Sequence, residues 1–292
     1  MLPRATVPVL LALALTHFAG CAGGAVRHPV ECRHGTVPSS DSVPIHYLEG
    51  GRGETALVFV HGWLGNASWW QPTMQHFAPR YRVVAVDLAG HGASGTGRAD
   101  WTVERFADDV AAVVRELGLE HVVLLGHSMS GAITVEAARR LGARVHLLVP
   151  IDTLNDLDWD LPPDVWARFF ADLRADFPAT VEDFFRQRLF LPRSPPEVAT
   201  QVVAEARVGP PERSVRMLEL NHSYDLRTAV ASLDVPIHAL NSDRDETKVA
   251  TNRRYARRFE VTILHGTGHW PMLEDPPGFA AALEAVLAAG LD

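Results

Sequence analysis

The chain has almost no lysine and very little cysteine. Lys248 is the only lysine among 292 residues, so arginine supplies nearly all of the positive charge, and the formal net charge at pH 7 is −8. A nucleic-acid-binding protein needs clustered cations to neutralise phosphates, so this charge balance argues against that class of protein. Two cysteines, Cys21 and Cys32, are too few for a disulfide framework.

The sequence also lacks an apolar run long enough to span a bilayer, which takes about 20 residues. The apolar run at residues 7–15 follows Arg4 and precedes several small residues. This order is typical of a secretory signal. We therefore predict a signal peptide over residues 1–20 and an exported protein.

The signal ends in Phe18-Ala19-Gly20-Cys21, which resembles the lipobox of bacterial lipoproteins, although Phe18 stands where leucine is usual. The resemblance implies that Cys21 carries lipid and anchors the protein peripherally to a membrane of the bacterial cell envelope. The alternative is ordinary cleavage at a neighbouring small residue, which yields a secreted or periplasmic soluble protein. In that case a disulfide between Cys21 and Cys32 could form.

Beyond a predicted polar linker at residues 21–40, short apolar runs alternate with helical stretches. Continuous apolar strands separated by helices favour an α/β protein with a mostly parallel sheet that is covered on both faces. The clearest predicted helix, residues 102–117, opens with Thr102 as N-cap and repeats Phe106 and Val110 on one side. The predicted strands cover residues 56–60, 82–86, 122–125, 145–149, 236–240 and 261–264.

The alternation stops between residues 153 and 232, where several helices follow one another without a strand. Aromatic residues recur there at helical spacing, as in Trp166, Phe169 and Phe170. We predict a helical lid over residues 153–232. The core would then consist of residues 41–152 and 233–292.

Two serines, Ser128 and Ser130, lie where the predicted strand 122–125 gives way to a helix. A nucleophile at the apex of such a tight turn needs small residues two positions before and after it. Gly126 and Ser130 meet that need for Ser128, and the helix that follows supplies amide N–H groups that favour developing negative charge. Ser130 would fall inside the first helical turn. The turn geometry therefore favours Ser128 as the nucleophile.

Four motifs in this order resemble those of the α/β-hydrolase superfamily. They are His61-Gly62-Trp63, Asp87-Leu-Ala-Gly-His-Gly-Ala-Ser94, Gly126-His-Ser-Met-Ser-Gly131 and Gly266-Thr-Gly-His-Trp-Pro-Met-Leu-Glu-Asp-Pro276. The resemblance covers nearly everything after residue 40. It implies the α/β-hydrolase fold, with the third motif as the nucleophile elbow and the first as the oxyanion loop.

The resemblance also implies a catalytic triad in the chain order Ser128, Asp245, His269. His269 follows the strand 261–264 through a glycine-rich turn and is the expected base. Asp245 takes the usual place of the acid after the strand 236–240, and the alternatives are Asp243 and Asp152.

The backbone N–H groups of Trp63 and Met129 are expected to form the oxyanion hole. His265 and His269 have the i, i+4 spacing of a metal-binding pair, but the glycines between them indicate a loop, and no His-Glu-x-x-His helix is present. We therefore expect no metal and no cofactor.

These residues predict a serine hydrolase that cleaves a small carboxylic ester, thioester or lactone. Its only expected partners are a small acyl substrate and, through the anchor, a membrane. A cofactor-free haloperoxidase or a carbon–carbon bond hydrolase would use the same triad. A non-catalytic ligand-binding receptor of the same fold is the alternative of another class.

Overall fold

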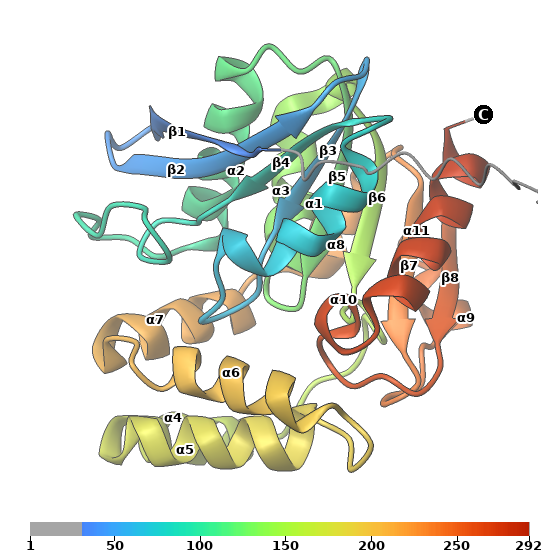
Figure 1. Cartoon of the computed structure of the whole chain (residues 1–292). Coiled ribbons are helices and arrows are strands. Elements are labelled where there is room, and N and C mark those ends of the chain that lie inside the picture. Colours follow the sequence, from blue (N-terminus) through green and yellow to red (C-terminus); the bar gives the residue numbers. More distant parts are fainter. Residues whose placement is uncertain (1–30, 292) are drawn as a thin grey trace, which may run out of the picture.

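The computed structural model describes residues 31–291, so the predicted signal peptide and Cys21 lie outside the described residues. An eight-stranded sheet forms its centre, in the order β1-β2-β4-β3-β5-β6-β7-β8 (Figure 1). β1 and β2 run antiparallel to their neighbours, and the remaining strands are parallel. The strands are β1 (Arg33–Pro38), β2 (Pro44–Gly51), β3 (Thr55–Val60), β4 (Arg82–Val86), β5 (His121–His127), β6 (Val145–Ile151), β7 (Ile237–Ser242) and β8 (Phe259–Leu264).

All six strands expected from the apolar runs are present, and the predicted α/β-hydrolase fold is confirmed. The central strands are apolar because helices cover both faces. In β3, for example, residues 56–60 are each at most 1% exposed. The sheet therefore fixes the positions of the loops that follow its strands.

The predicted linker over residues 21–40 is wrong at its C-terminal end, because β1 lies within it. β1 pairs with β2 in a regular register that includes Thr36 opposite His46. Only Val37 in this strand is buried, so no apolar run marks the strand in the sequence. Backbone pairing at the sheet edge stabilises it instead. The core begins by residue 33, not at residue 41.

Two pairs of helices cover the sheet. α1 (Gln71–Phe77) packs against α11 (Pro276–Gly290), and α2 (Val103–Glu116) packs against α3 (Ser130–Leu141) on the other face (Figure 1). Thr102 caps α2 by accepting a hydrogen bond from the Arg105 N–H, as the sequence predicts. The remaining short core elements are η1 (Ala67–Trp70), η2 (Gly142–Arg144), α9 (Val249–Asn252) and α10 (Pro271–Glu274).

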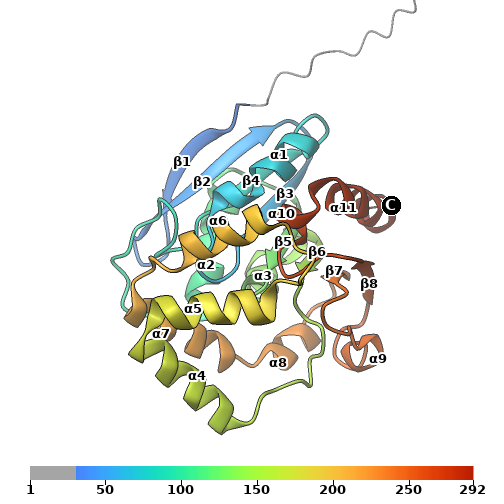
Figure 2. The ribbon, with the colours of Figure 1, turned by 60° about the horizontal axis from the view of Figure 1, so that its bottom comes forward.

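The segment between β6 and β7 contains helices and connecting loops but no strand, and most of its helices form a layer that lies below the sheet in Figure 1 (Figures 1 and 2). Four of its helices begin with a proline in the first turn, where the fixed φ of proline suits a helix start. No helix within residues 31–291 is long and apolar enough to cross a membrane. The elements are α4 (Pro163–Ala175), α5 (Phe177–Phe184), the π-helical turn η3 (Phe185–Leu189), α6 (Pro196–Ala206), α7 (Pro211–His222) and α8 (Leu226–Ala231). α8 packs on α3 of the core, so α4 to α7 with η3 make up the lid.

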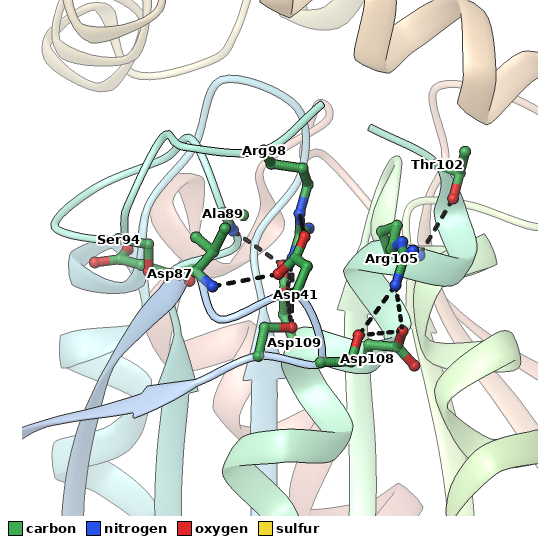
Figure 3. A network of polar contacts seen from close by, with 12 residues as sticks. Asp41, Asp87, Ala89, Ser94, Arg98, Thr102, Arg105, Asp108 and Asp109 are labelled. Atoms are coloured by element: carbon green, nitrogen blue, oxygen red, sulfur yellow. Dashed lines mark hydrogen bonds and ion pairs between the residues drawn. The ribbon is translucent and has the colours of Figure 1, made fainter. Parts of the chain in front are cut away.

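A buried ion pair joins the loop after β4 to α2 (Figure 3). The Arg98 guanidinium donates two hydrogen bonds to the Asp109 carboxylate, at 2.5 and 2.9 Å, and both side chains are fully buried. Asp109 also accepts from the Ser39 hydroxyl and the Ala89 N–H, and Arg98 reaches Asp41. Every oxygen of the buried carboxylate thus has donors, which a buried charge requires.

Substitution of Arg98 by methionine is expected to lower the free energy of unfolding by about 3 to 5 kcal/mol, because Asp109 would stay buried without its cation. Arg105→Met is the matched control: the Arg105 side chain is 40% exposed and its guanidinium lies 3.8 Å from the Asp108 carboxylate, so its loss should cost less than about 1 kcal/mol. Urea unfolding of both variants measures the difference. An equal loss of unfolding free energy in the two variants would show that the buried ion pair contributes no more to stability than the Arg105–Asp108 pair.

Candidate active site

Ser128 lies in the turn between β5 and α3, with a φ of 54°. A non-glycine residue in this left-handed region is strained by about 1 to 3 kcal/mol, and such strain is concentrated at functional sites. The turn is so tight that positions 126 and 131 have no room for a side chain. A Cβ at Gly126 would lie 2.3 Å from the Ser130 carbonyl oxygen, and one at Gly131 would lie 2.5 Å from Thr153.

Ser130 is fully buried in the first turn of α3. Its hydroxyl donates a 2.5 Å hydrogen bond to the carbonyl oxygen of His61. The side chain therefore ties the turn to the loop after β3 and does not face the same partner as Ser128. The structure gives the two neighbouring serines different surroundings.

His269 stands on the loop between β8 and α10, and it connects Ser128 to a carboxylate. Its Nε2 lies 2.8 Å from the Ser128 Oγ, and its Nδ1 lies 2.5 Å from the Asp152 Oδ2. With the proton on Nδ1, the imidazole donates to Asp152 and leaves Nε2 free to accept the serine proton. Two backbone contacts hold the loop: the His269 N–H donates to the Leu189 carbonyl, and the His269 carbonyl accepts from His127 Nε2.

The carboxylate partner is Asp152, the first residue after β6, and its side chain is fully buried. Burial by itself would raise the pKa of Asp152. The hydrogen bond and charge of His269 and the charge of Arg244 outweigh this, and the Ser242 hydroxyl adds a further bond, so the pKa lies well below its usual range. Asp152 is therefore ionised beside the imidazole.

The prediction that Asp245 contacts His269 is wrong. The Asp245 side chain is 54% exposed and pairs with Arg244 at 2.7 Å. Asp243, the second candidate, pairs with Arg193 and accepts from the Gly266 N–H. Because β7 extends to Ser242, the hydroxyl of Ser242 faces the site and donates to Asp152, whereas Asp245 lies farther along the loop.

The two expected oxyanion donors belong to segments that approach Ser128 in the structure. Met129 is the N-cap residue of α3, and Trp63 belongs to the loop after β3. Within residues 31–291 neither backbone N–H donates to a protein acceptor. Gly62 lets this loop approach, because a Cβ there would lie 3.0 Å from the Ser128 Cβ. Their role as an oxyanion hole stays a prediction.

His61 fixes the shape of the same loop. Its Nδ1 donates to the Gly62 carbonyl at 2.8 Å, and its Nε2 accepts from the Leu88 N–H at 3.1 Å. Burial lowers the pKa of His61, so the ring stays neutral and can accept at Nε2. The loop is thus fastened to the strand end that carries Asp87.

Asp87 in turn organises the loop after β4. Its carboxylate accepts from the backbone N–H groups of Ala67 and Ala93 and contacts His46 Nδ1 at 2.8 Å. It therefore stabilises loops around the site without contacting Ser128 or His269.

Comparison with known proteins agrees with the fold. A family model described as "Alpha/beta hydrolase family" matches residues 57–282. The chain belongs to this family. Its curated relatives include pimeloyl-[acyl-carrier protein] methyl ester esterases from Pectobacterium atrosepticum, 29% identical over 84% of this chain and 99% of that protein, and from Vibrio campbellii, 29% identical over 82% and 96%.

Solved structures of two esterases share the fold. The esterase from Exiguobacterium antarcticum has a TM-score of 0.79 at 18% identity, covering 88% of this chain and 100% of that one. The thermophilic esterase from Thermogutta terrifontis has a TM-score of 0.76 at 22% identity, covering 88% and 98%. These similarities establish the alpha/beta hydrolase architecture.

Aromatic side chains from the core and the lid of this alpha/beta hydrolase meet beside the triad residues. Trp270 contacts His269 edge-on, and its ring packs against Phe185 and Phe190 of the lid segment at centroid distances of 5.1 and 4.5 Å. Trp63 packs edge-on against Phe185 and Phe177. All of these rings are buried, so the surroundings of Ser128 on the lid side are apolar.

Sequence reasoning did not predict three side-chain contacts that hold the lid and the loops around Ser128 in place. The Trp63 indole N–H donates to the Ser214 carbonyl of α7, and the Asn221 side-chain amide of α7 donates to the Met129 carbonyl. The His127 Nε2 donates to the His269 carbonyl. These contacts join residues between 92 and 151 positions apart, so local sequence patterns carry no trace of them.

Two surface cavities, of about 370 and 340 Å³, lie away from Ser128. The larger one is beside Tyr224 and Arg139, and the smaller one is beside Trp69 and Gln201. No group of three or more His, Cys, Asp or Glu side chains in the described part of the chain is placed to hold a metal ion.

The two aspartates can be separated by substitution. Asp152→Asn is expected to lower ester turnover by roughly ten-thousandfold, because the amide cannot stabilise a protonated imidazole or fix its tautomer. Asp245→Asn is the matched control and should retain activity within about twofold, since the Asp245 side chain is 54% exposed and its ion pair is with Arg244, not His269. Steady-state hydrolysis of a p-nitrophenyl ester measures both. Loss of activity in Asp245→Asn with retention in Asp152→Asn would reverse the assignment.

Proposed function

We propose that this protein is a serine hydrolase that cleaves a small carboxylic ester through an acyl-enzyme on Ser128. The observation that carries the proposal is the continuous chain of contacts from the Ser128 Oγ through His269 to the buried Asp152 carboxylate. A free serine hydroxyl is a weak nucleophile and needs both a base and an orienting acid. The names of the curated relatives support ester hydrolysis.

In the proposed reaction His269 Nε2 takes the proton as the Ser128 Oγ attacks the ester carbonyl carbon. The imidazolium then protonates the leaving alcohol as the carbon–oxygen bond breaks. Water, deprotonated by the same nitrogen, attacks the acyl carbon. The bond to the Ser128 Oγ then breaks, the imidazolium returns its proton to that oxygen, and the carboxylic acid is released. Asp152 holds the ring and stabilises its charged form in each half of the cycle.

The tetrahedral intermediates carry negative charge on the former carbonyl oxygen. The backbone N–H groups of Trp63 and Met129 are the proposed donors to it, and such donors are worth about 3 kcal/mol each. Apolar surroundings strengthen these hydrogen bonds, because little water competes for the oxyanion.

The buried aromatic rings around Trp270 favour an apolar acyl group. The curated relatives are named for the methyl ester of pimeloyl-[acyl-carrier protein], in which the leaving alcohol is small. A short or medium acyl chain with a small alcohol is therefore the substrate class that we propose for this protein.

The first test is labelling of the purified mature protein with a fluorophosphonate, followed by mapping of the modified peptide. Label is expected on Ser128 and should be absent from Ser128→Ala. Ser130→Ala should still be labelled, because Ser130 donates to the His61 carbonyl and does not contact His269. Absence of label in the wild type, together with saturable ligand binding, would favour a non-catalytic receptor of the same fold.

We also propose that the protein is exported and anchored to a bacterial envelope membrane through lipid on Cys21. The support is the order of basic residue, apolar run and Phe18-Ala19-Gly20-Cys21 at the N-terminus. A lipoprotein that carries two or three acyl chains would be held stably, whereas one chain binds only marginally.

Substitution of Cys21 by alanine is expected to release the protein into the soluble fraction or to block processing of the signal. Membrane fractionation and the mass of the mature N-terminal peptide measure the two outcomes. Cys32→Ser is the matched control and should fractionate with the wild type. Unchanged membrane association of Cys21→Ala would contradict the lipid anchor.

A further inference from the structure

Arg244 brings a positive charge into direct contact with the acid of the triad. It follows β7 by two residues, and its side chain is 17% exposed. One terminal nitrogen lies 3.2 Å from the Asp152 Oδ2, the same oxygen that accepts from His269 Nδ1 at 2.5 Å. The other lies 2.7 Å from the exposed Asp245 carboxylate. Arg244 therefore lies between a buried and an exposed carboxylate.

We propose that Arg244 is a positioning residue that limits protonation of His269 by competing with it for Asp152, and that the lid holds Arg244 in this place. The inference rests on the proposed function, since it concerns the base of the same site. It adds a residue that acts on the base through the acid and does not contact the reacting atoms.

The competition follows from the geometry. Arginine stays charged throughout the working pH range, so Asp152 already faces one cation when the imidazole is neutral. A protonated His269 would add a second cation on the same carboxylate oxygen. The guanidinium and a protonated imidazole would both lie within 3.2 Å of the Asp152 Oδ2. Two positive charges this close to each other repel strongly in a buried site, and this repulsion disfavours the imidazolium. A neutral imidazole is the form that acts as the base.

In the part of the chain that the structure describes, Asp245 is the one carboxylate besides Asp152 that offsets Arg244, and water weakens its effect because its side chain is 54% exposed. His127 packs on His269 at a centroid distance of 4.7 Å, but burial lowers the pKa of His127 to about 3, so the ring is neutral. Glu274 accepts hydrogen bonds from the Gly268 and Trp270 N–H groups on the far side of the loop. Within residues 31–291, Arg244 is the one arginine or lysine in contact with Asp152.

The lid supplies the remaining support for Arg244. The π-helical turn η3 ends in two carbonyl groups that face the site: the Arg188 carbonyl accepts from Arg244 at 3.1 Å, and the Leu189 carbonyl accepts from the His269 N–H at 2.9 Å. π-helical turns occur often at functional sites. The same turn of the lid thus holds both the base and the cation that competes with it.

The Arg188 side chain itself is exposed, so its backbone carbonyl and not its charge makes this contact. Asp243 does not compete for Arg244 either, because its carboxylate is paired with Arg193 and His265.

The test is the pH dependence of Ser128 modification by a fluorophosphonate in the mature protein, from about pH 4 to about pH 9. This reaction needs the base but no natural substrate. In Arg244→Gln the acid limb of the rate profile should move to higher pH by about half a unit to one unit, because loss of the cation favours the protonated imidazole. Arg244→Lys, which keeps the charge, should stay within about 0.3 unit of the wild type.

Asp245→Asn is the matched control, since it removes the exposed partner of Arg244 and leaves the contact with Asp152. The acid limb of its rate profile should lie within about 0.2 pH unit of the wild-type limb. If Arg244→Gln is not folded by circular dichroism, Arg244→Met, which leaves no unpaired amide in the site, replaces it.

A uniform fall in rate at every pH, with the limb unmoved, would show that Arg244 has only a structural role. An equal shift in Arg244→Lys and Arg244→Gln would likewise overturn the inference, because charge would not be the cause. Failure of the wild type to react at any pH would instead overturn the proposed function. If the wild type reacts but the acid limb of the Arg244→Gln rate profile lies at the wild-type pH, only the inference about Arg244 is overturned.

Discussion

The hydrogen bond between His269 and Asp152 is the contact on which the site depends. It joins the end of β6 to the loop after β8, and β7 lies between these strands in the sheet. The pairing of β6 with β7 and of β7 with β8 therefore sets the distance between the imidazole and the carboxylate. Ser242 at the end of β7 donates to the same carboxylate. The buried Asp152 carboxylate at the end of β6 is therefore hydrogen-bonded by a residue at the end of β7 and by one in the loop after β8.

Much of this architecture could be predicted from the sequence, because the signals are local. Apolar runs mark the parallel strands, and the small residues around Ser128 mark the strained turn. β1 could not be predicted in this way. Its residues are mostly exposed and polar, and the strand exists because β2 offers a backbone edge to pair with. Edge pairing of this kind leaves no pattern in the side chains.

The acid shows a different limit of sequence reasoning. Asp245 and Asp152 both follow buried strands, and the spacing of the family motif favours Asp245. What decides between them is the direction in which each side chain leaves its strand end. Asp152 has a φ of 45° immediately after β6 and turns its carboxylate into the core, whereas Asp245 lies beyond Ser242 and reaches solvent. Backbone direction at a strand end is a property of the folded sheet, and spacing along the chain does not encode it.

Placing the acid at residue 152 also changes how the lid relates to the chemistry. The chain that leads into the lid leaves β6 at Asp152, and the π-helical turn of the lid contacts both the His269 backbone and Arg244. With the acid at residue 245, the chain leading into the lid would leave the core from a strand end outside the triad. Here the same strand end carries the acid and begins the lid, so a displacement of the lid bears on the carboxylate, the imidazole and the nearby cation together. In the proposed mechanism, changes in the lid should therefore alter the reactivity of His269 as well as the fit of the acyl group.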